Sequence, residues 1–86
     1  MTKYYTLFVF DTDQNLWFEE FGDYDRETVD FEAEELRHGY RSMPKKHIKI
    51  VRTSDHQDEI DAARFKLNEE AHRAEWSAQV KENLGL

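Results

Sequence analysis

The sequence predicts an α+β fold with the element order β-β-α-β-α, in which a three-stranded antiparallel or mixed sheet packs with helices and the C-terminal helix is long. Three observations predict it. Two aromatic-rich segments flank a turn-forming cluster, a third short segment shows the alternation of a strand, and about 28 residues that end near Asn83 contain no helix breaker. The 86 residues suffice for one core, and we expect a single domain over 1–86.

The first two strands are expected at 3–11 and 16–22, joined as a β-hairpin. Both segments, KYYTLFVFD and LWFEEFG, are dense in aromatic or β-branched residues, and the DTDQN between them is a turn-forming cluster. Both faces of the first strand are apolar. This pattern indicates a central strand, or a strand covered by a helix on one face and by an aromatic patch on the other.

The first helix is expected to run from an N-cap at Asp25 to about His38, with Gly39 as its C-cap. Its apolar face consists of Val29, Ala33, Leu36 and Tyr40. The opposite side carries the acidic ridge, which we define as Glu27, Asp30, Glu34 and Glu35. Phe31 projects from the middle of this ridge, nearly opposite the apolar face.

A third strand is expected at 46–53, after a loop that contains Pro44. Within this strand, Ile48 and Ile50 should point inward, with Lys49 and Val51 on the other side. We expect it to complete the sheet.

The long helix is expected to begin at a capping box of Ser54 and Gln57, with Asp55 as the competing N-cap, and to end near Asn83. One apolar stripe contains Ile60, Ala63, Leu67, Ala71, Ala74 and Ala78. A second stripe, roughly opposite, contains Phe65, Trp76 and Val80, with His72 beside them. This second stripe either covers the chain's own sheet edge or terminus, or forms the interface of a homodimer or of a partner complex.

Charge is distributed unevenly along the chain, whose net charge is −7. Residues 11–36 contain eleven acids and one base, whereas residues 37–52 contain six bases and no acid. Because phosphate binding needs a basic surface, we expect a basic partner and no direct binding to DNA. For the basic run three interpretations remain: intramolecular charge balance, a docking site for an acidic partner, and contact with RNA or DNA.

The composition also excludes several classes of protein. There is no cysteine, so a disulfide framework and a thiolate metal site are absent, as is usual in a reducing cytoplasm. No apolar run approaches the roughly 20 residues of a membrane span, and the first residues lack the cleavage pattern of a secretory signal. We expect a soluble cytoplasmic protein that does not bind membranes.

The sequence has no catalytic, cofactor or metal motif, so we expect a non-enzymatic protein without a cofactor. Asp11, Asp13 and Asn15 match only the opening of a calcium-binding loop. Leu16 and Gly22 stand where that loop needs glycine and glutamate. A turn is therefore the preferred interpretation, and a metal-assisted hydrolase is the least favoured function.

Two segments, FGDYDRETVDFEAEE at 21–35 and SDHQDEIDAARFKLNEE at 54–70, belong to a short, acidic, aromatic-rich chain. In size, charge and style the chain resembles the small accessory proteins encoded by bacteriophages, of the anti-CRISPR and anti-restriction inhibitor type. That resemblance implies a protein of the host cytoplasm that inhibits a nucleic-acid-binding complex. Several such inhibitors present carboxylates where DNA phosphates would lie.

We therefore expect a binding protein that blocks a basic, nucleic-acid-binding surface of a host protein complex, acting as a mimic of DNA. Its carboxylates would pair with Arg or Lys of the target, while two aromatic side chains give apolar anchoring. The expected partner-binding residues are Asp23, Tyr24, Asp25, Glu27, Asp30, Phe31, Glu34 and Glu35. The alternative is a homo-oligomeric structural or scaffold protein that assembles through the long helix, with the acidic face only solubilising it.

Overall fold

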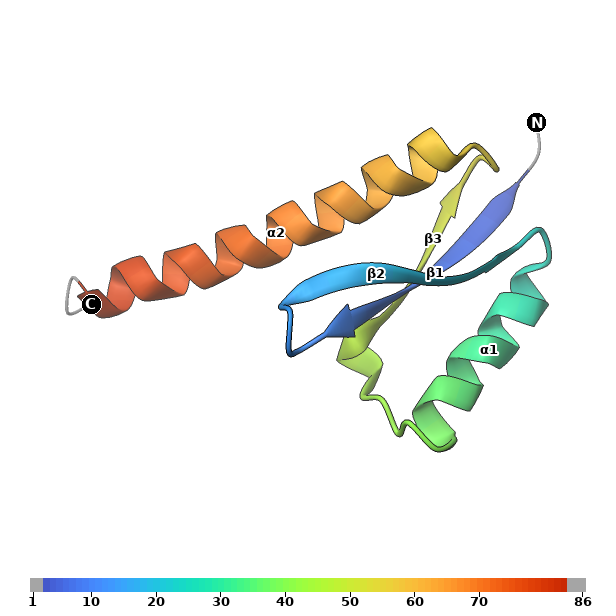
Figure 1. Ribbon diagram of the computed structural model, residues 1–86, viewed down its shortest axis with the longest axis horizontal. Coiled ribbons are helices and arrows are strands. Elements are labelled where there is room, and N and C mark those ends of the chain that lie inside the picture. Colours follow the sequence, from blue (N-terminus) through green and yellow to red (C-terminus); the bar gives the residue numbers. More distant parts are fainter. Residues whose placement is uncertain (1–2, 84–86) are drawn as a thin grey trace.

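The computed structural model describes the backbone of residues 3–83 and the side chains of residues 3–73. The elements are β1 (Tyr4–Asp11), β2 (Leu16–Asp23), α1 (Arg26–His38), the 3₁₀ turn η1 (Lys45–His47), β3 (Ile48–Thr53) and α2 (Gln57–Asn83) (Figure 1). The predicted α+β class and the order β-β-α-β-α are confirmed.

The three strands form one antiparallel sheet in the order β2-β1-β3, so β1 is the central strand as one of the two interpretations predicted. The two helices lie on opposite sides of this sheet (Figure 1). Helix α1 packs on β1 and β2, whereas α2 packs on β2 and β3. The side of β3 that faces α1 is therefore left partly uncovered.

Each face of β1 supports its own apolar core, which explains why both faces of its sequence are apolar. On the α1 side, Leu7 packs with Val29 and Ala33. On the α2 side the buried cluster consists of Phe8, Trp17, Ile60 and Leu67. The sheet is thus the middle of three layers, and each helix buries one stripe against it.

A β-bulge in β2 lets this strand contribute an aromatic side chain to each core. Leu7 pairs with Phe21 and Phe8 pairs with Glu19, so Glu20 is an extra residue in the ladder. Trp17 and Phe21 would share a face in a regular strand, because side chains alternate with a period of two. The bulge instead directs Trp17 toward α2 and Phe21 toward α1.

The predicted start of α1 is confirmed. Asp25 is the N-cap, and its carboxylate accepts hydrogen bonds from the N–H of Glu27 at 3.2 Å and from the hydroxyl of Thr28 at 3.0 Å. These bonds satisfy one of the free N–H groups of the first turn.

The helix ends at His38, and Gly39 is its C-cap as predicted, although the reason differs from the usual one. The φ of Gly39 is −88°, so no left-handed conformation is required. Its N–H donates to the carbonyl of Glu35 at 2.8 Å, and a Cβ at this position would collide with that same oxygen. Tyr40 lies beyond the helix and is fully exposed, so its assignment to the apolar face was wrong.

The third strand begins at Ile48 and not at residue 46, because Lys45–His47 form a 3₁₀ turn. Pro44 has an extended backbone and accepts the N–H of His47 at 2.9 Å, which closes this turn. The N–H of Ile48 then bonds to the carbonyl of Lys45.

Helix α2 is 27 residues long and ends at Asn83, as predicted. Its predicted capping box of Ser54 and Gln57 was wrong, since Glu59 accepts the N–H of Ser54 at 2.9 Å. Hydrogen bonding by Ser54 lowers the pKa of Glu59 below its usual range. Gln57 is free to reach other partners.

The first apolar stripe of α2 is confirmed over the described side chains. Ile60 and Leu67 are buried, and Ala63 and Ala71 pack beside them. Ala74 and Ala78 belong to the part of α2 whose side chains lie outside the described residues.

Within 3–83, no helix combines the length and the apolar character that crossing a membrane requires.

Candidate functional site: the two exposed sides of helix α1

The outer stripe of α1, which we define as Glu27, Phe31 and Glu35, points away from the sheet. Val29 is fully buried against β1, and Phe31 lies about 200° around the helix from it. The Phe31 side chain is 63% exposed. Glu27 and Glu35 stand one turn before and one turn after it, so carboxylates flank an exposed ring on both sides.

The structure divides the acidic ridge into two parts. Arg26 Nε lies 3.2 Å from Asp30 Oδ1, and Arg37 Nη1 lies 3.4 Å from Glu34 Oε1. His38 Nε2 approaches the other oxygen of Glu34 at 3.0 Å. These pairs are exposed and add little stability, but they offset the charge of two ridge carboxylates.

In contrast, no ion pair is formed by Glu27 or Glu35 with any other residue of the described chain. Both side chains are exposed. Their charges are therefore available to a partner, together with the ring between them.

Two other predicted site residues, Asp23 and Asp25, stabilise the turn between β2 and α1 by hydrogen bonds to its backbone. Asp23 Oδ1 accepts the N–H of Asp25 at 2.8 Å, and Asp25 caps the helix. Because their carboxylates already accept backbone hydrogen bonds, a substitution at either position would alter the turn as well as the surface charge.

The predicted site residue Tyr24 does not lie beside the outer stripe. Its ring packs edge-to-face on Tyr4 at a centroid distance of 5.0 Å, and Tyr4 belongs to the α2 side of the sheet. The Tyr24 hydroxyl donates to Asp55 Oδ2 at 3.0 Å. This hydrogen bond, followed by the negative charge of Asp55, raises the pKa of Tyr24. Tyr24 remains 55% exposed, but on a different surface from Phe31.

The other exposed side of α1 forms the wall of a groove, which we call the β3 groove. Its volume is about 470 Å³. It is lined by Arg26, Asp30, Ala33, Glu34, Arg37, Lys45, Ile48 and Ile50. Ile48 and Ile50 point inward as predicted and pack against the core on the α1 side, but they stay half-buried and form the groove floor. The spacing of Arg26, Ala33 and Arg37 on α1 is the signal that could have identified this second stripe.

The basic run at 37–52 is only partly balanced within the protein. Arg37 pairs with Glu34, and Arg41 Nη1 contacts Glu20 at 2.6 Å, so intramolecular balance accounts for two of the six bases. The four remaining bases form no ion pair with the rest of the described residues: Lys45, Lys46, Lys49 and Arg52. The amine of Lys49 instead lies 5.4 Å from the centre of the Trp17 ring.

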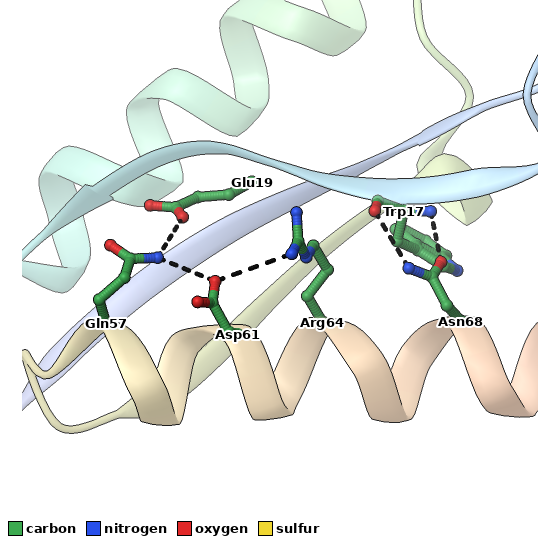
Figure 2. Close-up of polar contacts among 6 residues, drawn as sticks. All are labelled: Trp17, Glu19, Gln57, Asp61, Arg64 and Asn68. Atoms are coloured by element: carbon green, nitrogen blue, oxygen red, sulfur yellow. Dashed lines mark hydrogen bonds and ion pairs between the residues drawn. The ribbon is translucent and has the colours of Figure 1, made fainter.

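The edge of β2 is closed by polar side chains of α2 (Figure 2). Asn68 Oδ1 accepts the Trp17 N–H at 2.6 Å, and Asn68 Nδ2 donates to the Trp17 carbonyl at 3.3 Å. Gln57 Nε2 lies 3.0 Å from both Glu19 and Asp61. The Asn68 amide therefore occupies the backbone groups of Trp17 that an additional strand would need.

The predicted oligomer interface is described only at Phe65, which is 69% exposed. The described part of the chain does not cover this ring, and an apolar hollow of about 400 Å³ lies beside it, next to Leu16 and His72. The side chains of Trp76 and Val80 lie outside the described residues.

The hairpin at Asp11 is a turn, as preferred over a calcium loop. Asp11 Oδ1 accepts the N–H groups of Asp13 at 2.8 Å and of Gln14 at 3.3 Å, and Asn15 adopts a φ of 59°. Over the described residues, no group of three or more acidic or histidine side chains is placed to hold a metal ion.

Comparisons with protein-family models, with curated proteins and with solved structures give no match.

The two exposed sides of α1 differ in chemistry. The outer stripe offers carboxylates around a ring, while the β3 groove offers an aliphatic floor with a cationic rim.

Proposed function

We propose that this protein is a non-enzymatic binding protein that blocks a basic, nucleic-acid-binding surface of another protein. The observation that carries this proposal is the 63% exposure of Phe31 between Glu27 and Glu35, on the side of α1 opposite the sheet. A large exposed ring contributes little to the fold, and apolar surface rimmed by charge is typical of protein–protein contact sites.

The proposed mechanism is competition. Carboxylates of the outer stripe pair with the Arg and Lys residues that otherwise hold phosphates, while the Phe31 ring enters an apolar site among them. The stripe extends over two turns, about 12 Å along the helix axis. Residues 23–38 carry seven acids and two bases, so a cationic surface is attracted to this end of the molecule before contact.

The proposed setting is the cytoplasm of a bacterial host, as for the phage-encoded inhibitors that the sequence resembles. There the target would be a complex that binds nucleic acid, of the kind inhibited by anti-CRISPR or anti-restriction proteins. The protein would act as a mimic of DNA and would not itself bind DNA.

The experiment is affinity capture from bacterial lysate, followed by a displacement assay. The retained protein is identified, bound to a labelled DNA or RNA duplex, and titrated with the wild-type chain. We expect release of the nucleic acid, and we expect Glu35→Lys to weaken release more than tenfold.

The matched control is Glu70→Lys, which makes the same charge change at an exposed position of α2. It should release the nucleic acid as the wild type does. Equal effects of the two variants would contradict a specific role of the outer stripe, and release without competition for the same site would contradict mimicry.

A second candidate function is a homo-oligomeric scaffold that assembles through α2. It is favoured by the exposure of Phe65 and by the length of α2, which extends past the sheet (Figure 1). Twenty-seven helical residues span about 40 Å, against about 27 Å for an eight-residue strand. Trp76 and Val80 stay predicted members of this interface.

Sedimentation equilibrium tests the scaffold. An oligomer that dissociates in Phe65→Glu or Trp76→Glu would support it. A native monomer at high micromolar concentration would remove it.

A further inference from the structure

The strand β3 lies at the edge of the sheet, and no other strand within residues 3–83 lies beside the outer side of its backbone. The N–H of Ile48 bonds to Lys45 in the preceding turn and so points away from β1. In an antiparallel ladder, alternate residues direct their N–H and C=O groups to opposite sides. The backbone groups of Ile50 and Arg52 therefore also face the open side, where an added strand would find them.

The two edges of the sheet differ. The edge of β2 is closed at Trp17, where Asn68 bonds both backbone groups (Figure 2). Among residues 3–73, no side chain bonds the backbone of Ile50 or Arg52 in this way, and α1 lies over β1 and β2. An extended segment can therefore join the sheet at β3 but not at this part of β2.

Beside this open edge, the β3 groove provides room for side chains of an added strand. Ala33, Ile48 and Ile50 give its floor an aliphatic character, and its volume of about 470 Å³ is enough for several aliphatic side chains. None of the described residues that line it is aromatic, and the nearby Tyr5 ring lies under the Arg26 guanidinium, 5.6 Å from the ring centre. Since bases of single-stranded nucleic acid stack on aromatic rings, the groove does not suit them.

The charge around the groove is positive, although the whole protein is acidic. Arg26, Arg37 and Lys45 form the rim together with Asp30 and Glu34. Arg52 follows Ile50 on the same face of the strand and pairs in register with Tyr5. Four cations thus stand against two carboxylates, in a chain whose net charge is −7. On the opposite face of β3, Lys49 is exposed as well.

We propose that β3 and the β3 groove bind an extended acidic peptide of a partner protein, which adds to the sheet as a fourth strand. Its backbone pairs with the open groups of Ile50 and Arg52. Apolar side chains at every second position enter the groove, and the excess of cations around the groove attracts the acidic segment to it. This site is separate from the outer stripe of α1, so it would stand even if the proposed function failed.

A second copy of the chain fits this edge poorly. Symmetric pairing of β3 with β3 would bring four unpaired bases of each copy to one seam: Lys45, Lys46, Lys49 and Arg52. Eight cations along one seam repel one another, whereas an acidic strand neutralises them.

The test is a titration of the isotope-labelled full chain with a capped six-residue peptide that alternates Val and Glu, followed by amide NMR. We expect shifts confined to β3 and to the groove side of α1, together with slower hydrogen exchange at Ile50 and Arg52. A peptide of the same length that alternates Val and Lys should cause no shift at the same concentration.

The matched variants are Lys45→Glu on the rim and Lys66→Glu on the exposed surface of α2. We expect at least a fivefold weaker affinity for the Val-Glu peptide in Lys45→Glu and no change in Lys66→Glu. Both variants make the same change in net charge, so a difference between them reports position.

Four outcomes would overturn the proposal. They are no binding of the Val-Glu peptide at a Kd of about 1 mM or tighter, equal binding of both peptides, shifts located on the outer stripe, and equal effects of the two Lys variants. Protection of Ile50 that depends on protein concentration without peptide would identify a second copy as the occupant. Shifts of the same amides by a six-nucleotide RNA alone would identify a nucleic acid instead.

Discussion

The side chain of Asn68 forms hydrogen bonds with both the backbone N–H and the backbone C=O of Trp17, although the two residues are 51 positions apart in the chain. One amide side chain thus replaces the neighbour that an edge strand lacks, and it fixes α2 to β2 at the same time (Figure 2). We expect Asn68→Ala to reduce the free energy of unfolding by about 1–3 kcal/mol, because it leaves a part-buried N–H and C=O unpaired. Urea denaturation would measure this loss. Glu70→Ala, on the exposed side of α2, should stay within about 0.5 kcal/mol of the wild type, and an equal loss in both variants would contradict the role of Asn68.

Thr6 offers a way to stabilise the protein. Its side chain is fully buried in β1, and Oγ1 has no hydrogen-bond partner among the described residues. We expect Thr6→Val to raise the free energy of unfolding by about 1 kcal/mol, since the shape is kept and an unsatisfied hydroxyl is removed. Thr6→Ser keeps the hydroxyl and loses the methyl group, so it should destabilise. A loss of stability in Thr6→Val, measured by urea denaturation, would mean that the hydroxyl has a partner.

Phe31 and Val29 are two residues apart in the sequence but lie on opposite sides of α1, so we expect different effects of their substitution on stability. Phe31→Ala should leave the free energy of unfolding within about 0.5 kcal/mol and weaken binding to the captured partner, because the ring is exposed. Val29→Ala should destabilise by about 1–3 kcal/mol, because Val29 is fully buried. Thermal unfolding and partner titration separate the two effects. A loss of 3–5 kcal/mol in Phe31→Ala, typical of a buried Phe, would place the ring in the core.

Salt provides a test of recognition by charge. Exposed charges are screened beyond about 8–10 Å at physiological ionic strength, so affinity for the captured partner should fall steeply as salt is raised. The Glu27→Gln variant should show a shallower dependence on salt, because it removes one of the charges that are available for pairing. Affinity that stays constant from low to high salt would favour an apolar interface through α2.

Tyr24 predicts a dependence of stability on alkaline pH. Its hydrogen bond to Asp55 favours the protonated phenol and raises its pKa above the usual 10.0 in the folded state. The folded-state pKa exceeds the unfolded one, so this stabilisation is complete below pH 10 and is lost as the pH rises through the higher folded value. Tyrosinate absorbance and unfolding measured across this range would show it. Tyr24→Phe should remove part of the dependence, while Tyr40→Phe, at a fully exposed site, should leave it unchanged.

The sequence predicted the elements because their signals are local. Alternation of apolar residues marks the strands, and the short range of a helix cap allowed Asp25 to be recognised from its neighbours alone. The start of α2 was misjudged because two acceptors compete for the N–H of Ser54, and Gln57 turns instead to Glu19 on a distant strand. Which side chain accepts the N–H of Ser54 depends on the tertiary structure, because a distant strand supplies the partner of Gln57.

The bulge at Glu20 and the open floor of the β3 groove could not be predicted, because both depend on how segments distant in the sequence pack together. A bulge is a property of the register between Leu7 and Phe21, and no local pattern specifies it. The groove exists because α1 lies over β1 and β2, which leaves Ile48 half-buried. The exposure of Phe31 was predictable, since it follows from the helical period relative to Val29.

The difference between the two edges of the sheet also limits how this protein can polymerise. A chain that adds strands at both edges can propagate into a fibre, because each added copy presents a new edge to the next. Here Asn68 blocks the edge of β2 at Trp17, so among the described strands β3 offers the more open edge for growth through the sheet. A single strand added at β3 covers this edge, so a peptide bound there would prevent further copies of the protein from adding to the sheet.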